Sequence, residues 1–498
     1  MTTLATTNAV PESGAFSGNL CAEVRETHTG VVVLVGDRAY KVKKPVVTDF
    51  LDFSTPDRRE RACLREYTLN SRLSPDSYLG IAHLNNAAAP AEPVIVMRRY
   101  PDSRRLASLV KHGQPVEHHL ASIAEKLSRF HARAARGGSI DACATVDAIA
   151  ARWQENLDEL RRHAGTVLRQ ESIEEVQRLA RQFISGRSPL FTHRITEGRI
   201  VDGHADLLAD DIFCMPEGPI LLDCLEFDDQ LRYVDGIDDA AFLAMDLEFL
   251  GRHDLGEHFM DQYSRFASDI APRSLKDFYI AYRAVVRAKV DCVRVSQGHP
   301  HAVTDAQRHI DIALEHLRTD TVRLILIGGG PGTGKTTLAH ALAKRIGAQV
   351  ISTDDVRRQL QQAGTITGTV GVLDEGLYSA ENVAAVYDEL LRYPHLYLRA
   401  GQSVILDGTW RDARQRERAR KLADETASPI VEFTCSVPLD EASARIHNRP
   451  ATSSDATPHI AAALTDHNGA SPAGHLIDTG RPLADSVAEA EEICCLTA

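Results

Sequence analysis

The stretch 329-GGPGTGKT-336 follows directly on the apolar run Val322–Ile327 and leads into the helix-favouring segment Thr337–Lys344. A strand, a glycine-rich loop and a helix, in this order, form the setting in which the pattern G-x-x-x-x-G-K-[ST] binds phosphates. Glycines let the backbone wrap closely around an anion, and the N-terminus of the next helix adds its positive end. The stretch therefore predicts an α/β domain with a parallel sheet and a P-loop that binds ATP or GTP together with Mg²⁺.

Each residue type in this loop has an expected task. We expect Lys335 to reach the β- and γ-phosphates and to serve catalysis, and the Thr336 hydroxyl to ligate Mg²⁺. A glycine-rich turn that binds no nucleotide is the alternative, which the number of matching positions disfavours. The predicted nucleotide-binding residues are Gly329, Gly330, Pro331, Gly332, Thr333, Gly334, Lys335, Thr336 and Thr337.

A second apolar run, Val404–Asp407, ends in an acid. Acids at the carboxyl end of a strand beside a P-loop lie near the metal, so Asp407 is predicted to bind Mg²⁺ through water or to act as the catalytic base. The alternative is that Asp407 only caps a helix.

Further candidates flank these motifs. Asp354 and Asp355 follow a short apolar run, where an acid can contact the hydroxyl of an acceptor, although Asp355 is also a candidate helix N-cap. Arg445 and Arg449 fall on a late predicted helix, and Arg449 is predicted to meet the phosphates. A solvated helix face is the alternative for both arginines.

Taken together, the segment Val322–Arg449 resembles the small P-loop kinases of the AAA-33, zeta-toxin and gluconate-kinase kind. This resemblance implies transfer of the γ-phosphate of ATP to a hydroxyl of a small molecule. Beyond Pro450 only the strand-like run His475–Thr479 and a final amphipathic helix are consistent with the family, and neither is specific.

The preceding 320 residues begin with strands and continue mostly with helices, which predicts an α+β domain with a small sheet lobe and a larger helical lobe. A Gly36-Asp37 turn indicates one hairpin, and Pro216–Gly218 indicates a second. The predicted segments are strands within 31–35, 39–42, 92–97, 211–214 and 219–223, and helical stretches at 57–73, from 101 to about 185, and from 237 to about 317. The predicted domains are a flexible segment 1–22, a first domain 23–320 and a P-loop domain 321–498.

Another informative stretch runs from Asp202 to Phe227 and contains His204-Ala205-Asp206, then Asp211, then Asp223. It looks like the core of the aminoglycoside-phosphotransferase and choline-kinase family, whose pattern is H-G-D-x-x-x-x-N followed by a strand that ends in a metal-binding Asp. The resemblance spans roughly residues 23–316 and implies a protein-kinase-like, two-lobed phosphotransferase fold.

The family resemblance also implies roles for individual residues. Asp206 would be the catalytic base, and Asp211 and Asp223 would bind the metal ions. Lys41 would be the phosphate-binding lysine of the sheet lobe, with Glu66 as its ion-pair partner. Lys43 and Lys44 are close enough in sequence to leave the choice of lysine open.

Two departures from the family pattern bear on activity. Ala205 stands where the family has Gly, which restricts the backbone of the loop. Asp211 stands where the family has Asn, which adds a negative charge at the metal site. An active phosphotransferase and a degenerate, nucleotide-sensing regulatory domain are therefore both open interpretations.

Composition limits the remaining possibilities. A chain of 498 residues exceeds what one hydrophobic core supports. A formal net charge of −13 gives no general attraction to nucleic acid or to anionic lipid, and an aromatic fraction of 6% does not favour a polynucleotide-binding groove. Nine cysteines without a C-x-x-C pair predict reduced thiols. Without a signal peptide or an apolar run of about 20 residues, we expect a cytoplasmic protein with a small-molecule partner and no membrane contact. No feature indicates an oligomeric state.

Overall fold

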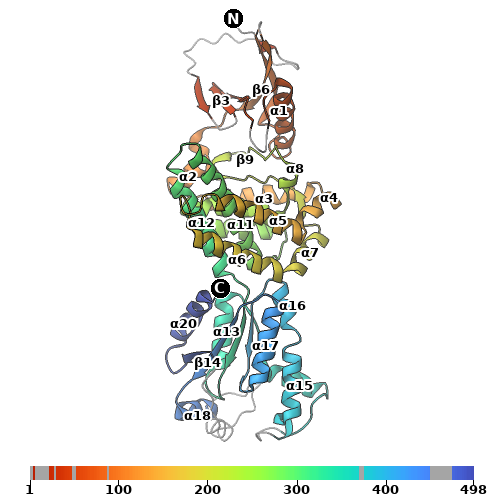
Figure 1. Ribbon diagram of the computed structural model, residues 1–498, viewed down its shortest axis with the longest axis vertical. Helices are drawn as coiled ribbons and strands as arrows, with labels where there is room; N and C mark the ends of the chain where they lie inside the picture. The colour runs from red at the N-terminus through yellow and green to blue at the C-terminus, as the bar shows by residue number, and fades with distance from the viewer. Residues whose placement is uncertain are drawn as a thin grey trace. The chain divides into compact units, whose positions relative to one another are not determined.

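The computed structural model describes residues 4–5, 22–26, 30–47, 52–86, 89–369, 375–448 and 474–497 (Figure 1). By its internal contacts the chain forms two compact units, each built from two stretches. The first unit is Met1–Ala148 with Arg194–Ala271, and the second unit is Ile149–His193 with Pro272–Ala498. The predicted boundary at residue 320 divides the sequence differently from these contacts, and it stays a prediction, as does the flexible segment 1–22.

The first unit contains a six-stranded antiparallel sheet with the order β1-β5-β6-β4-β3-β2. Its predicted hairpin is confirmed, because Val35 pairs with Arg38 across the turn, where Gly36 has a φ of 58°. Helix α1 (Pro56–Asn70) packs on β5 and β6, and the hydroxyl of Thr55 caps its N-terminus. The strands are β1 (Leu4–Ala5), β2 (Glu23–Glu26), β3 (Gly30–Val35), β4 (Arg38–Lys43), β5 (Tyr78–Asn86) and β6 (Ala89–Arg98).

The rest of the first unit is mainly helical. The second predicted hairpin is also confirmed, since β8 (Ile212–Met215) pairs with β9 (Gly218–Leu221). Phe213 of β8 and Leu222 share a core cluster with Ile95 of the sheet and Cys63 of α1, so hairpin and sheet pack together. The other elements are α2 (Leu106–Lys111), α3 (Glu117–Arg133), α4 (Gly138–Asp141), β7 (Ile200–Asp202), α8 (Asp229–Arg232), β10 (Tyr233–Asp235), α9 (Gly236–Phe249) and α10 (His253–Phe266).

The second unit contains a five-stranded parallel sheet with the order β12-β13-β11-β14-β15, which confirms the α/β prediction. Helices α13 (Lys335–Ile346) and α20 (Leu483–Leu496) bury apolar residues against one face, while α17 (Ala413–Glu425) covers the other (Figure 1). The strands are β11 (Leu324–Gly328), β12 (Gln349–Ser352), β13 (Val404–Asp407), β14 (Ile430–Ser436) and β15 (His475–Asp478), and the shorter helices are α14 (Thr353–Gln362), α15 (Ala380–Leu390), α16 (Pro394–Arg399) and α18 (Leu439–His447).

Helices that precede the sheet in sequence belong to the same unit. They are α5 (Val146–Arg161), α6 (Gln170–Gly186), the beginning of α7 (Ser188–Thr196), α11 (Arg273–Ser296) and α12 (Ala302–Thr319). An aromatic cluster joins them, with Phe278 of α11 lying 4.4 Å from Phe183 and 5.3 Å from Trp153 between ring centroids. The cluster ties α5 and α6 to α11 across a gap of about 100 residues in sequence.

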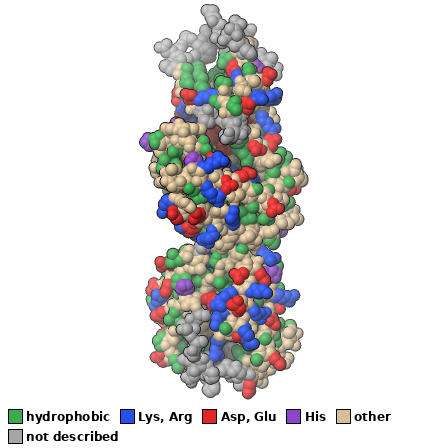
Figure 2. Space-filling view, in the orientation of Figure 1, with side chains coloured by type: hydrophobic (Ala, Val, Ile, Leu, Met, Phe, Trp, Pro, Cys, Tyr) green, Lys and Arg blue, Asp and Glu red, His purple; other side chains and the backbone are tan. Residues whose placement is uncertain are grey.

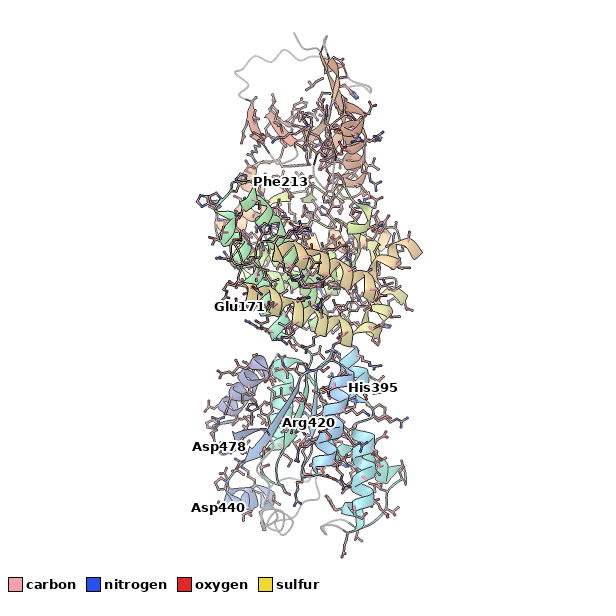
Figure 3. The ribbon with its side chains drawn as sticks, in the orientation of Figure 1. Glu171, Phe213, His395, Arg420, Asp440 and Asp478 are labelled. Carbon is pink, nitrogen blue, oxygen red and sulfur yellow. The ribbon has the colours of Figure 1, made fainter. Side chains whose placement is uncertain are left out.

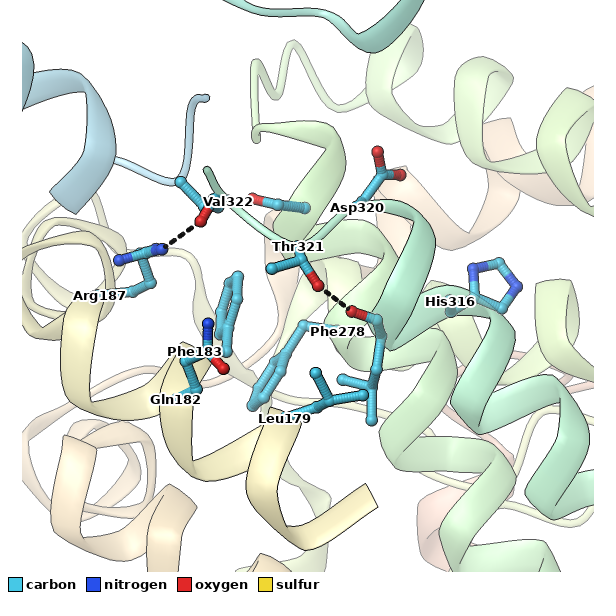
Figure 4. Close-up of a pocket in the computed structure, with 11 residues that line it drawn as sticks. Leu179, Gln182, Phe183, Arg187, Phe278, His316, Asp320, Thr321 and Val322 are labelled. Carbon is cyan, nitrogen blue, oxygen red and sulfur yellow. Dashed lines mark hydrogen bonds between the residues drawn. The ribbon is translucent and has the colours of Figure 1, made fainter. Parts of the chain in front are cut away.

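Arg187 connects this helical group to the sheet. Its guanidinium donates to the carbonyl oxygens of Thr426 at 2.6 Å and Val322 at 3.4 Å, and to the hydroxyl of Ser428 at 3.1 Å. Figure 4 shows Arg187 reaching Val322 in a small pocket that Phe183, Phe278, Asp320 and Thr321 also line. These acceptors lie just before β11 and β14. The helices therefore contact the amino ends of these strands, opposite the carboxyl ends where the P-loop lies.

No helix within the described ranges is long and apolar enough to cross a membrane. The cysteines among the described residues are free thiols, as predicted.

Candidate functional site

The P-loop connects central strand β11 to the N-terminus of α13, and its backbone can be built only with glycines at several positions. Gly329, Gly332 and Gly334 have φ values of 136°, 79° and 83°. A Cβ atom on Gly332 would lie 2.5 Å from the carbonyl oxygen of Ala442, and one on Gly329 would lie 2.7 Å from that of Cys435. The turn therefore needs glycine both for its backbone angles and for its close packing.

Lys335, Thr336 and Asp407 meet at the carboxyl end of the sheet. The Lys335 ammonium donates to the carbonyl of Gly330 at 2.8 Å, and the Thr336 hydroxyl donates to Asp407 Oδ2 at 2.6 Å. Asp407 is buried, and this burial raises the pKa of its carboxyl, although Lys335 and Thr336 lower it in part. A hydroxyl and a carboxylate placed side by side are ligands that Mg²⁺ accepts, so the residues fit the predicted metal.

The structure also answers two questions that the sequence left open, namely whether Asp407 and Asp355 are helix caps. Asp407 does not cap a helix, since the cap of α17 is Asp412. Asp355 is exposed on α14, whose N-cap is Ser352. Asp354 lies in the first turn of α14 and forms a 2.6 Å ion pair with Arg357.

Several residues near the carboxyl end of the sheet were not predicted by the sequence motifs. Tyr387 accepts a hydrogen bond from the amide of Trp410 at 3.2 Å, and the two rings meet edge to face at 5.1 Å. Arg357 lies over the ring of Tyr378 at 4.6 Å. Tyr378 belongs to the short 3-10 helix η4 (Gly376–Tyr378) and Tyr387 to α15, and only the folded chain brings these elements together.

Arg445 lies beside the P-loop, whereas Arg449 falls outside the described residues. Arg445 donates to Glu441 at 2.6 Å and to the carbonyl of Thr479 at 2.8 Å. Its guanidinium would lie 3.4 Å from a Cβ atom on Gly334, and Thr479 donates to the carbonyl of Thr333 at 2.6 Å. Arg445 and Thr479 therefore contact the P-loop directly, and Thr479 was not predicted to do so.

A second cluster lies in the first unit, where sheet, α1 and the loop after β9 meet. The Lys41 ammonium donates to Asp223 Oδ1 at 2.7 Å and lies 2.8 Å from Glu66 Oε1. Lys43 donates to Glu66 and to Glu226, both at 2.8 Å. Of the three lysines left open by sequence, Lys41 is the one beside the predicted metal ligand, while Lys44 pairs with the exposed Glu26.

The predicted metal ligands Asp211 and Asp223 lie close to one another and to Asp206. Burial and the nearby charges of Asp223 and Asp206 raise the pKa of Asp211 well above its ordinary range. Lys41 lowers the pKa of Asp223 despite its burial. Three carboxyl groups that repel one another without a cation form the oxygen-rich donor set that Mg²⁺ prefers.

The loop that carries Asp206 adopts an unusual backbone, held by a residue that sequence did not assign to the site. Ala205, in place of the family glycine, has a φ of 66°. The amides of His204 and Ala205 both donate to Asp239 of α9 at 2.7 Å. Asp239 also contacts His131, which lowers the pKa of Asp239 although burial alone would raise it. The two adjacent acids Asp238 and Asp239, near the start of the mostly apolar α9, were the sequence signal that could have pointed to this role.

Comparisons with known proteins agree with the P-loop assignment. A family model described as an AAA domain, AAA_33, matches residues 324–468. An adenylate kinase from Vanderwaltozyma polyspora is 34% identical over 116 residues, which are 22% of this chain and 50% of that protein.

Two solved structures give a weaker likeness. A choline/ethanolamine kinase family protein from Mesorhizobium loti has a TM-score of 0.38 and 15% identity, covering 61% of this chain and 93% of that one. A sugar kinase from Janibacter sp. has a TM-score of 0.27 and 18% identity, covering 34% of this chain and 92% of that one. Scores below 0.5 decide nothing about the first unit, whose interpretation rests on its own contacts.

Two mycobacterial proteins are similar to this chain over nearly its whole length. The uncharacterized protein Rv2004c of Mycobacterium tuberculosis is 60% identical over 472 residues, which are 95% of each chain. The uncharacterized protein Mb2027c of Mycobacterium bovis gives the same values. The chain therefore belongs to the family of these mycobacterial proteins and carries an AAA_33 P-loop domain in its C-terminal part.

Proposed function

We propose that the protein is an ATP-dependent phosphotransferase with two nucleotide sites, each transferring the γ-phosphate to a hydroxyl of a small molecule. The observation that carries the proposal is the contact of Thr336 with Asp407 directly beside the Lys335 ammonium. Bound ATP and Mg²⁺ would supply the phosphoryl group and the charge that stabilises its transfer.

In the P-loop site, the residues of the chain divide the work between nucleotide and acceptor. Lys335 leaves the Gly330 carbonyl to bind the phosphates, and Thr336 and Asp407 hold the metal. Asp354 lies close enough for its charge to raise the pKa of Asp407, so it can orient an acceptor hydroxyl on the same side.

In the first unit, Asp206 takes the role of base, Asp211 and Asp223 hold metal ions, and Lys41 binds the phosphates. The convergence of three carboxyl groups supports this assignment, since the three groups repel one another and bound cations would relieve that repulsion. Asp239 holds the amides of His204 and Ala205 and so positions Asp206.

A nucleotide-binding regulatory protein with an inactive first unit is the second candidate. The observation in its favour is Lys41, whose hydrogen bond to Asp223 occupies the predicted metal ligand. Acceptor-dependent product from the first unit would exclude this candidate.

The Lys and Arg side chains near α17 do not make the P-loop domain a strong candidate for phosphorylating polynucleotides. Figure 2 shows Lys and Arg side chains gathered in the region of α17, with Asp and Glu among them. Arg418 pairs with Asp388 at 2.8 Å, and Arg420, labelled in Figure 3, pairs with Glu432 of β14 at 2.6 Å. These acidic partners reduce the positive charge that this face offers to phosphates.

The test separates the two sites in the full-length chain. Lys335→Ala is expected to weaken ATP binding at the P-loop site by about 10- to 100-fold, the range for losing a charged hydrogen bond, with little change in stability. Asp206→Ala is expected to abolish acceptor-dependent product from the first unit. Calorimetric ATP titration and a product assay over sugar, amino-sugar and choline-like acceptors give the two measurements.

Lys344→Ala, an exposed change on the same helix, is the matched control for Lys335. Unchanged ATP affinity in Lys335→Ala would remove the P-loop assignment. Unchanged product in the double variant Lys335→Ala with Asp206→Ala would remove the phosphotransferase proposal.

A further inference from the structure

Two lysines of β4 share one buried carboxylate. Side chains alternate along a strand, so Lys41 and Lys43 face the same side of the sheet. Glu66 of α1, whose side chain is fully buried at 0% exposure, has Lys41 at 2.8 Å from Oε1 and Lys43 at 2.8 Å from Oε2. Each carboxylate oxygen of Glu66 therefore has its own cation.

The two contacts with Glu66 are not equivalent. Lys43 donates a hydrogen bond to Glu66, whereas Lys41 lies at ion-pair distance without hydrogen-bond geometry and donates to Asp223 instead. The Lys41 side chain is 16% exposed and that of Lys43 is 2% exposed. Lys41 is thus the lysine that can turn toward a ligand, and Lys43 is the one that stays.

Movement of Lys41 has an electrostatic cost that Lys43 reduces. Under the proposed function, Lys41 leaves Asp223 for the phosphates, and Asp223 becomes a metal ligand. A buried carboxylate that lost its only cation would be strongly destabilised. Glu66 keeps the hydrogen bond from Lys43 throughout, so the exchange does not leave it uncompensated.

Lys43 also reaches the loop that follows Asp223. It donates to Glu226, three residues after Asp223, at 2.8 Å, and its ammonium lies 5.0 Å from the centre of the Phe53 ring. The amide of Cys224 donates to Asn70 of α1 at 2.8 Å, which ties the same loop a second time. These tethers hold a loop in which Asp223 has a φ of 63°.

We propose that Lys43 is a positioning residue, the permanent counter-ion of Glu66 and the anchor of Glu226, which frees Lys41 to exchange between Asp223 and a nucleotide. The assignment of the nucleotide to this exchange rests on the proposed function of the first unit. The release of Lys41 by Lys43 is a property of the chain alone.

The test measures Lys41 without nucleotide. Acetic anhydride labelling of the full-length protein, followed by peptide mass spectrometry, gives the acylation rate of each lysine. Lys43→Met leaves Lys41 as the sole cation for Glu66, so Lys41 is expected to be acylated at least several-fold more slowly. Lys44→Met, which removes a lysine that pairs with the exposed Glu26, is the matched control, and Lys43→Arg should restore the rate in part.

A second variant keeps the proposal testable if Lys43→Met does not fold. Glu226→Gln removes the anchor charge and leaves the Lys43 contact with Glu66, so Lys41 should label no more slowly than in the wild type. In the background of Lys335→Ala, however, Mg²⁺-dependent ATP binding at the first unit should require at least several-fold more Mg²⁺. Wild-type labelling of Lys41 in folded Lys43→Met would overturn the proposal, as would an unchanged Mg²⁺ requirement in Glu226→Gln.

The two hypotheses fail differently in this experiment. Slower Lys41 labelling together with no ATP binding by the Lys335→Ala background would support the counter-ion role and refute the nucleotide site. Normal ATP binding together with unchanged Lys41 labelling would support the nucleotide site and refute the counter-ion role.

Discussion

At the scale of single residues, the acids of the two sites differ in their surroundings. Asp407 accepts a hydrogen bond from the Thr336 hydroxyl and Asp223 accepts one from the Lys41 ammonium, whereas burial and two nearby acids raise the pKa of Asp211. Motif spacing predicted these acids, because each follows a short apolar run or a fixed loop pattern. It could not predict their partners, since Lys41 and Asp223 are 182 positions apart.

Asp407→Asn should separate binding from chemistry. The amide keeps the size of the side chain and an oxygen for Thr336 but loses the charge that serves the metal, so phosphoryl transfer should fall by about 100-fold or more while ATP affinity changes by less than about tenfold. Steady-state rates and calorimetric titration check the two effects. Asp412→Asn, a cap residue that Asn replaces well, is the control, and equal rates for Asp407→Asn and wild type would contradict a metal role.

At the scale of elements, the local sequence pattern was sufficient to predict a strand or hairpin where a turn residue or an apolar run marked it. The hairpin at Gly36, the hairpin β8–β9, and strands β11 and β13 follow the predicted ranges closely. The order of strands in the parallel sheet, and the role of Asp239 at the catalytic loop, depend on packing between distant segments. No local period in the sequence carries that information.

Helices α11 and α12 meet at a pair of acids with opposite pKa shifts. Burial, and then the hydrogen bond with Asp277, raise the pKa of Asp320 to about 8, whereas the pKa of Asp277 is lowered by its hydrogen bonds with Asp320 and His316 despite burial. The Asp320 carboxyl therefore keeps its proton in the folded state up to about pH 8 but loses it near pH 4 when unfolded. Between these values the folded state binds more protons, so the contribution of Asp320 to the free energy of unfolding falls as pH rises.

Asp320→Asn should remove this pH dependence. The wild-type protein is expected to lose stability relative to the variant, on the order of a few kcal/mol, between about pH 5 and 8.5. Urea unfolding followed by tryptophan fluorescence is selective here, because both tryptophans, Trp153 and Trp410, lie in the second unit. Parallel stability curves for wild type and variant across this window would contradict the assignment.

At the scale of the whole molecule, each compact unit combines segments that are far apart in the chain. Arg187 is the clearest link within the second unit, since it is 1% exposed and bonds neutral acceptors of the sheet domain. Burial lowers its pKa to about 9, so it remains charged at neutral pH. The loss of this residue would remove the charged donor to the carbonyls of Thr426 and Val322.

Arg187→Met tests this link in the full-length protein. Removing a buried charge gives back part of its desolvation cost, but hydrogen bonds from charged groups contribute about 1.5–3 kcal/mol each, so we expect a net loss of about 2–4 kcal/mol. The measurement is urea unfolding by tryptophan fluorescence. Arg181→Met, an exposed change on α6, should shift the midpoint little; an equal shift for both variants would show that Arg187 has no special role.

The aromatic cluster of the second unit has a consequence for synthesis on the ribosome. Phe183 leaves the ribosome about 100 residues before Phe278, its stacking partner, which at ~5–20 residues per second is a delay of ~5–20 s. Throughout that interval the apolar faces of α5 and α6 have no α11 to cover them. Translation rate and chaperone occupancy over residues 193–272 should therefore govern how much newly made chain reaches the folded state.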